Sequence, residues 1–428
     1  MELALSEYQA ALDYLYARTT GAFKFGLERT RALLAELGDP HLAVPVVHVA
    51  GTNGKGSAVA TAEALLRAKG LRVARYTSPH LVDFRERIVV DGRPIAPEAV
   101  VEFVHRWMPD VERIGASFFE ATTAMAFAHF AAMRPDVAVI ETGLGGRLDS
   151  TNVVLPRAAG VTSIGLDHTE YLGPTLESIA REKAGIFKHD VPAVIGEPDP
   201  AVSGWLASAA KRAGASAVRL APVEARVSDV ALDETGTAFT LDALGERARV
   251  VTPLAGRHQA LNFAFTLVLL DAAGAPFATS LPDAAKAAPS IRLPGRFQRV
   301  DRWIFDVAHN ADGARTLAAT LRAVGDTDVT VLICVLADKD WRGMLEALRP
   351  IAARFILTDA PTAPASRRWS LADALDYARS STLHAVAQPD FDAALTLAES
   401  ERGITLVTGS FHTVGDAMAR LQVSPLTG

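Results

Sequence analysis

Short apolar runs of strand length alternate along this chain with segments whose apolar residues recur at helical spacing. Strands that are buried on both faces read as continuous apolar runs, so this alternation is typical of a parallel sheet whose strands are joined by helices. Glycine or polar residues end most of the runs, as expected where strands lead into loops. The pattern predicts an α/β fold with a mostly parallel sheet, with strands at residues 46–50, 71–76, 136–140 and 160–164 and helices at 58–69 and 118–133.

Shorter patterns add to this alternation. Residues 8–16 and a second segment that ends near Gly38 carry apolar residues at helical spacing, which predicts a helical cover at the N-terminus. An aspartate–glycine pair at residues 91–92 stands between apolar residues and predicts a hairpin. Short alternating segments with glycine turns predict a small antiparallel sheet at residues 216–251.

A second, shorter alternation begins after a stretch rich in proline and alanine. We expect this stretch, residues 283–294, to be a linker. Beyond it, residues 303–310 predict a strand and turn, a helix follows, and residues 331–336 predict a further strand. These features predict a P-loop NTPase-like domain of residues 1–290 and a smaller, Rossmann-like domain of residues 291–428.

The composition is that of an ordinary globular protein. Of 428 residues, 49% are hydrophobic and 21% are charged, and the formal net charge of −6 gives no reason to expect a nucleic acid as a partner. The one cysteine, Cys334, lies in an apolar run, so we expect a buried packing thiol and no disulfide within the chain. The N-terminus lacks the apolar region of a signal peptide, and no segment approaches the length of a membrane span. We therefore expect a cytoplasmic monomer that binds small molecules, with no membrane partner.

A glycine-rich turn at residues 51–57 (GTNGKGS) joins the first apolar run to the first long predicted helix. Its glycines leave room for phosphate oxygens to approach the backbone, and the helix N-terminus adds donors. Lys55 supplies a charge for the outer phosphates, and Ser57 lies where a P-loop hydroxyl reaches a phosphate-bound Mg²⁺. Gly56 stands between them, which departs from the standard P-loop pattern. The alternative is a glycine turn without a ligand, but the order strand, turn and helix favours a nucleotide site.

Polar residues stand at the ends of three predicted strands, at the edge where open α/β sheets bind ligands. Ser78 and His168 follow two of these strands, and Glu141 ends a third. A carboxylate in this position is typical of the Mg²⁺ ligand of nucleotide enzymes, so we predict that the three residues lie at a metal site. The alternatives are a strand-end glutamate that faces water and a histidine that only forms loop hydrogen bonds.

The second predicted domain also carries polar residues at its strand ends. These residues are Asp306, His309, Asp338 and Ser410. Because the carboxyl ends of parallel strands lie at one edge of a sheet, we expect them to face the first domain across a cleft. The cleft predicts a site for a small substrate.

Two charged features have simpler interpretations from composition. Lys183 lies close to a glycine at the end of a predicted helix, where a surface lysine is the ordinary reading. Residues 85–87 (RER) form a charged strip, which composition favours as a solvated edge of a strand or loop. Neither feature predicts chemistry without further information.

Several motifs in fixed order resemble those of one protein family over almost the whole chain. The sequence is similar to the Mur ligase superfamily, and more closely to its folylpolyglutamate synthase and dihydrofolate synthase branch, in which the extra glycine of the P-loop is typical. The motifs that carry the resemblance are residues 51–57, 78–81 (SPHL), 85–88 (RERI), 119–120 (FE), 141–152 (ETGLGGRLDSTN), 182–186 (EKAGI), 293–297 (LPGRF) and 306–310 (DVAHN).

The resemblance implies a role for each matched residue. It implies ATP and two Mg²⁺ ions as cofactors, with catalytic roles for Lys55, Glu141, His168 and Lys183, of which Lys183 matches a lysine that is carbamylated. Such a modification turns a cation into an anionic oxygen ligand, which makes electrostatic sense beside a metal. The implied ATP-binding residues are Gly54, Lys55, Gly56, Ser57, Asn262, Arg296, Asp306 and His309, the implied metal ligands are Ser78, Glu141 and His168, and the implied pterin or folate residues are Ser117, Leu148, Asp149 and Ser150.

The implied reaction is ATP-dependent amide bond formation. A substrate carboxylate attacks the γ-phosphate to give an acyl phosphate and ADP, and the amine of L-glutamate then attacks the activated carbonyl. The implied acceptors are dihydropteroate, folyl (poly)glutamate, or both. Two alternatives stay open, namely a ligase of the same superfamily that acts on a cell-wall peptide precursor, and a P-loop nucleotide switch without ligase activity.

Overall fold

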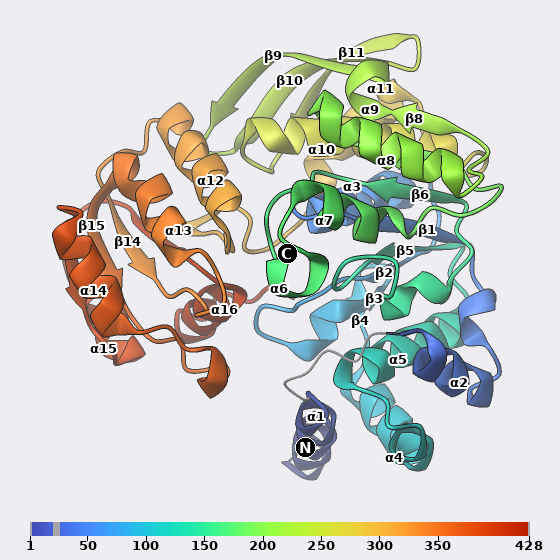
Figure 1. Ribbon diagram of the computed structural model, residues 1–428, viewed down its shortest axis with the longest axis horizontal. Coiled ribbons are helices and arrows are strands. Elements are labelled where there is room, and N and C mark those ends of the chain that lie inside the picture. Colours follow the sequence, from blue (N-terminus) through green and yellow to red (C-terminus); the bar gives the residue numbers. More distant parts are fainter. Residues whose placement is uncertain (1, 20–25, 427–428) are drawn as a thin grey trace.

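The larger of two α/β domains is built on an eight-stranded sheet. Figure 1 shows this domain in the computed structural model. The structure describes residues 2–19 and 26–426. The strand order is β4-β3-β2-β5-β1-β6-β7-β8, and β2 to β8 in this order run parallel while the β3–β4 edge is antiparallel. The strands are β1 (Val46–Ala50), β2 (Val73–Tyr76), β3 (Ile88–Val90), β4 (Arg93–Pro94), β5 (Val137–Glu141), β6 (Ala158–Val161), β7 (Ala193–Ile195) and β8 (Val218–Leu220).

Helices cover both faces of this sheet, which explains why its strands read as continuous apolar runs. Val47 and Val49 of β1 pack into one core, whereas Val46 packs into the core on the opposite face, as the two-residue period of a strand requires. The first face is covered by α3 (Lys55–Ala68), α10 (Arg257–Ala272) and α11 (Leu281–Ala287), and the second by α1 (Glu2–Ala17), α2 (Glu28–Glu36), α4 (Pro97–Ile114), α5 (Phe118–Met133), α7 (Leu176–Ala184) and α8 (Pro200–Arg212).

A three-stranded antiparallel sheet extends the first domain, as the alternating pattern at residues 216–251 predicts. It has the order β11-β10-β9 and packs on α10 through Phe239, which meets Phe263 edge to face. Its strands are β9 (Ala225–Asp233), β10 (Gly236–Ala243) and β11 (Glu246–Thr252), and the four-residue helix α9 (Ala221–Glu224) precedes them. The hairpin prediction at residues 91–92 is also confirmed, since Val90 of β3 pairs with Arg93 of β4.

The second domain has a six-stranded sheet in the order β12-β13-β17-β14-β15-β16, which is parallel except for the β12–β13 pair. In Figure 1 it forms the orange and red lobe beside the first domain. Its strands are β12 (Gln298–Val300), β13 (Trp303–Phe305), β14 (Val329–Ile333), β15 (Ala352–Leu357), β16 (Ala385–Ala387) and β17 (Thr405–Thr408), and its helices are α12 (Ala311–Val324), α13 (Trp341–Leu348), α14 (Leu371–Ser380), α15 (Phe391–Ser400) and α16 (Phe411–Arg420). The α/β prediction, with two mostly parallel sheets, is confirmed.

The linker prediction for residues 283–294 is wrong over most of its length. Leu281–Ala287 forms α11, a 3₁₀ turn continues it to Ser290, and Leu281 and Ala284 are buried against the first core. Small apolar residues at a spacing of three give this alanine-rich stretch a helical face, which its prolines obscure. Cys334 is buried as predicted, and burial raises the pKa of its thiol to about 12. Within the described residues, no helix is both long and apolar enough to cross a membrane.

Candidate active site

The glycine-rich turn after β1 curls over the N-terminus of α3. Gly54 is the residue before the helix, with φ of +90°, and a Cβ atom there would stand 2.5 Å from Oδ1 of Asn262 on α10. Lys55 folds back over the turn, and its Nζ donates to the carbonyl oxygens of Gly51 and Thr52 at 3.1 Å each. The turn therefore combines a helix N-terminus and a lysine in the arrangement that holds a polyphosphate.

Gly54 permits a direct test of the phosphate site. Gly54→Ala adds left-handed strain of about 1–2 kcal/mol and a collision with Asn262, so we expect the Kd for ATP to rise roughly tenfold by calorimetry. Gly38→Ala is the matched control, because Gly38 has φ of +79° with open space around it. Both variants should lose thermal stability. Equal ATP affinity in the two variants would contradict a phosphate site at this turn.

The carboxylate that ends β5 faces this turn. Nζ of Lys55 lies 3.9 Å from Oε1 of Glu141, and the charge of Arg296 and a backbone N–H of Ser78 also stabilise the ionised carboxylate. Burial outweighs them and raises the pKa of Glu141. A buried carboxylate of this kind is a fitting ligand for a cation. The structure places Lys55, Ser78 and Arg296 around Glu141, and the metal site itself stays a prediction.

Lys183 of α7 is buried beside the same turn. Its side chain is not on the surface, since the residue is 5% exposed and Nζ donates to the carbonyl oxygen of Gly51 at 2.8 Å. Burial lowers its pKa to about 7, and the positive charge of Lys55 adds to the effect. The surface reading of Lys183 from composition is therefore wrong. An amine with this pKa is neutral often enough near pH 7 to act as a nucleophile.

His168 lies directly before α6 (Thr169–Leu172), beside an aspartate that sequence reasoning did not single out. Nε2 of His168 is 3.3 Å from Nζ of Lys339, a second-domain lysine that lies 2.5 Å from Oδ1 of Asp167. Burial lowers the pKa of His168 to about 3, so the imidazole is neutral. A metal bound at Nε2 would have to displace Lys339 from this atom. The role of His168 as a metal ligand stays a prediction.

The second domain brings the remaining nucleotide candidates to the same edge. The guanidinium of Arg296 lies 5.1 Å from the ring centre of Phe411. The carboxylate of Asp306 accepts backbone N–H bonds from Phe297 and Ala308 at 2.9 Å each. Nε2 of His309 is 3.3 Å from Oδ2 of Asp167. A residue that follows a strand of the second domain thus contacts the first domain at Asp167, whereas the cleft between the domains stays a prediction.

The predicted pterin residues already have partners within the first domain. Ser117 caps α5 and accepts a bond from the N–H of Glu120, and Asp149 accepts N–H bonds from Gly143, Leu144 and Thr151. These bonds fix the loops that carry the candidates. Leu148 is partly buried and Ser150 is buried. A role in substrate binding stays a prediction for all four residues.

The charged strip at residues 85–87 is not a solvated edge. Arg87 is 7% exposed, its Nε donates to Nδ1 of His80 at 2.7 Å, and its guanidinium lies 5.3 Å from the ring centre of Phe118. Tyr16 stacks on Phe118 with ring centres 5.4 Å apart. The neighbours of Arg87 in the strip, Arg85 and Glu86, are part-buried, and composition could not predict the burial of the strip. Arg87, Phe118 and Tyr16 therefore form a cationic and aromatic cluster on the first domain.

Comparison with known proteins identifies the architecture. Residues 49–270 match the family model of the Mur ligase middle domain, and residues 295–411 match that of the Mur ligase, glutamate ligase domain. The chain is 34% identical over 436 residues to the dihydrofolate synthase/folylpolyglutamate synthase of Bacillus subtilis (strain 168), with 97% of this chain and 99% of that protein covered. The chain belongs to the dihydrofolate synthase/folylpolyglutamate synthase family of Mur ligases.

Solved structures of this family share the fold of this chain. Mycobacterium tuberculosis folylpolyglutamate synthase complexed with ADP is 33% identical, with a TM-score of 0.90, and 99% of this chain and 100% of that chain are covered. A bifunctional folylpolyglutamate synthase/dihydrofolate synthase with Mn, AMPPNP and L-glutamate bound is also 33% identical, with a TM-score of 0.82 and coverage of 97% and 98%. The present family member is accordingly an ATP-dependent ligase.

The donor set of this ligase fits a hard divalent cation. Across residues 2–19 and 26–426, no three His, Cys, Asp or Glu side chains converge as a preformed metal cage. Mg²⁺ sites that use substrate phosphates need only one or two carboxylates, with waters completing the octahedron. Glu141, with the predicted ligand Ser78 next to it, meets that requirement, and it faces the turn that would hold the phosphates.

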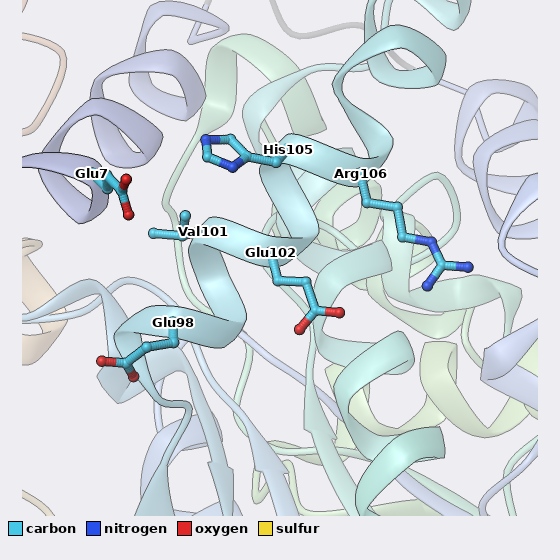
Figure 2. Close-up of a pocket in the computed structure, with 6 residues that line it drawn as sticks. All are labelled: Glu7, Glu98, Val101, Glu102, His105 and Arg106. Carbon is cyan, nitrogen blue, oxygen red and sulfur yellow. The ribbon is translucent and has the colours of Figure 1, made fainter. Parts of the chain in front are cut away.

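A cavity of about 530 Å³ lies elsewhere in this ligase, between α1 and α4. Figure 2 shows Glu7 approaching from α1 and Glu98, Val101, Glu102 and His105 along α4, together with Arg106. None of the lining residues belongs to the glycine-rich turn or to a strand end. The cavity is therefore separate from the catalytic edge of the sheets.

Proposed function

We propose that this ligase joins the amine of L-glutamate to a carboxylate of dihydropteroate, of a folyl (poly)glutamate, or of both. The observation that carries the proposal is the meeting of Lys55, Glu141 and Arg296 at the junction of the domains. A phosphate loop and a second domain that share one site suit a reaction in which ATP activates one substrate for attack by another. The family names support folate acceptors, and the L-glutamate bound in a related structure supports the amine donor.

The chain's own residues account for the first half of this reaction. Lys55 and Arg296 neutralise the repulsion between the attacking carboxylate and the triphosphate, and the backbone N–H groups at the start of α3 orient the phosphates. Glu141 and Ser78 would hold a Mg²⁺ ion here, which would supply further charge neutralisation. The acceptor carboxylate forms a bond to the γ-phosphorus, ADP leaves, and an acyl phosphate results.

The second half of the reaction requires the glutamate amine and the exclusion of water from the site. The glutamate amine attacks the acyl carbon, phosphate leaves, and the amide forms, so water has to be kept from the same carbon. We expect His309, which follows β13 of the second domain and contacts Asp167 of the first, to help exclude water from this side of the site. The Tyr16 and Phe118 rings next to Arg87 offer a flat surface of the kind that stacks on an aromatic acceptor.

Initial rates with dihydropteroate, tetrahydrofolate and a cell-wall peptide precursor, each with ATP and labelled glutamate, test the proposal. We expect label in an amide product with at least one of the two folate acceptors and none with the peptide precursor. A ratio of kcat/KM for the two folate acceptors separates a dihydrofolate synthase from a folylpolyglutamate synthase. ATP cleavage without an amide product from any acceptor would favour the nucleotide switch instead.

We also propose that Lys183 is carbamylated. Its folded-state pKa is lowered to about 7, so the neutral amine that reacts with CO₂ prevails above that pH and is lost below it. With ¹³C-labelled bicarbonate, we expect a carbamate resonance at about pH 8 that fades towards pH 6 and is missing from Lys183→Arg. Lys188→Arg, in which a less buried lysine is replaced, should keep the resonance. No resonance at saturating bicarbonate would contradict this proposal.

Other features of the ligase complete the proposal. We propose two Mg²⁺ sites, with Ser78, Glu141 and His168 as ligands and with carbamylated Lys183 helping to hold the second ion. The domain division at residues 1–290 and 291–428 is supported by family models that end at residue 270 and begin at residue 295. We propose a cytoplasmic monomer, which sedimentation of the purified chain and fractionation of cells would test.

A further inference from the structure

Polar groups of the second domain surround the buried carboxylate of Asp167. Nζ of Lys339 lies 2.5 Å from Oδ1, and both side chains are less than a tenth exposed. Nε2 of His309 lies 3.3 Å and Nδ2 of Asn310 lies 3.5 Å from Oδ2. From its own domain the carboxylate accepts the N–H of His168 at 2.8 Å. A buried carboxylate in this setting depends on the second domain for its partners.

The loop after β14 directs one charge across the domain boundary. Asp338 pairs with Arg367 of its own domain at 2.7 Å, and Asp340 caps α13 by accepting the N–H of Gly343. Lys339, between them, points the other way and reaches Asp167 of the first domain. Asp338 and Asp340 are thus bound within the second domain, whereas Lys339 of the same loop links it to the first domain.

The contact lies beside the phosphate turn. Nδ2 of Asn310 also donates to Oδ1 of Asn53, a residue of the glycine-rich turn, at 3.2 Å. The second domain therefore contacts the first domain at Asp167 directly beside the predicted ATP site. A gap at this point would admit water next to the activated acyl group.

We propose that Asp167 is a positioning residue that docks the second domain onto the ATP site through Lys339, and that this contact couples ATP cleavage to amide formation. The inference rests on the proposed ligase reaction. When the contact is broken, water attacks the acyl carbon in place of the glutamate amine. The bond from carbon to the phosphate oxygen breaks, phosphate leaves, and the acceptor carboxylic acid is regenerated with ATP spent.

The test measures ADP formed and glutamate incorporated in the same reaction of the full-length enzyme. Wild type should form one ADP per amide. For Lys339→Met and Asp167→Asn we expect the ratio of ADP to amide to rise on the order of tenfold, the change that loss of one charge-assisted hydrogen bond makes to an equilibrium. The double variant should match the single variants, because the two residues act as one unit. Arg354→Met, which removes a second-domain cation paired with Glu401, should keep the wild-type ratio.

Gly415 of α16 provides an independent variant at another point of the same interface. A Cβ atom there would stand 2.0 Å from the carbonyl oxygen of Leu81 in the first domain, so Gly415→Ala should separate the domains and raise the ratio as well.

A folded Asp167→Asn or Lys339→Met enzyme with the wild-type ratio would overturn the proposal. So would equal losses of ADP and amide, which would place Lys339 in the chemical step. If wild type itself forms no amide with either folate acceptor, the proposed function fails. That result is distinct from an unchanged ratio in the variants and from equal losses of ADP and amide.

Discussion

Lys55→Met is expected to lower kcat by about 10³-fold, which is the size of effect seen when one preorganised charge at a transition state is removed. Lys55 Nζ sits over the carbonyl oxygens of the phosphate turn and 3.9 Å from Glu141, so its charge acts on the γ-phosphate and on the attacking carboxylate together. Methionine keeps the length of the side chain and removes the charge. Initial rates of labelled glutamate incorporation at saturating ATP measure the effect.

A second lysine variant controls for loss of charge in general. Lys211 is exposed in the last turn of α8, and Lys211→Met should leave kcat within twofold of wild type. Circular dichroism of Lys55→Met should show a folded protein, because both hydrogen bonds of the lysine go to carbonyl groups of its own turn and its ion pair with Glu141 is long, at 3.9 Å. Full ligation by folded Lys55→Met would remove the glycine-rich turn from the mechanism.

Glu141→Gln is expected to abolish most activity while leaving the protein at least as stable. The carboxylate is buried and burial raises its pKa, so the ionised form costs free energy that a neutral amide of the same shape does not. Function should respond in the opposite direction, because glutamine is a poor ligand for a hard cation. We expect the affinity for Mn²⁺ in the presence of AMPPNP to fall by about tenfold to 100-fold. We expect kcat to fall by a similar or larger factor.

Glu197 supplies the matched control for this experiment. It is also buried, follows β7 of the same sheet, and accepts the N–H of Ile164 at Oε2 and the N–H of Asp199 at Oε1, of which the single oxygen of glutamine can still accept one. Glu197→Gln should keep its affinity for Mn²⁺ with AMPPNP. If both variants bound the metal like wild type, Glu141 would not be a ligand, and a fall in Tm for Glu141→Gln alone would show that its charge stabilises the fold.

Much of the fold follows from local pattern, and the exceptions have local reasons. The β1 strand is five apolar or buried residues followed by glycine, and such a run has few alternatives in an α/β chain. The stretch at residues 283–294 misled because its prolines resemble a linker, although Pro282 lies in the first turn of α11, where proline is tolerated. Proline content without its helix position is therefore a weak sign of a domain boundary.

The site was predictable where single strands end and unpredictable where distant segments meet. Glu141 is marked by the strand that precedes it. Burial of Lys183 and Arg87 comes from packing of other elements over them, and no local pattern reports that. The pair of Asp167 and Lys339 joins residues 172 positions apart, so only the docking of the two domains reveals it. A charged triplet after a buried strand, at residues 338–340, was the one available signal.

The most direct test of the account is a crystal structure of this enzyme with AMPPNP and Mn²⁺, with the metal located by its anomalous scattering. We predict that the triphosphate lies in the turn at residues 51–57 with Lys55 on its outer phosphates, and that an anomalous peak stands within coordination distance of Glu141. A nucleotide bound at any other place, or a metal peak away from Glu141, would contradict the account.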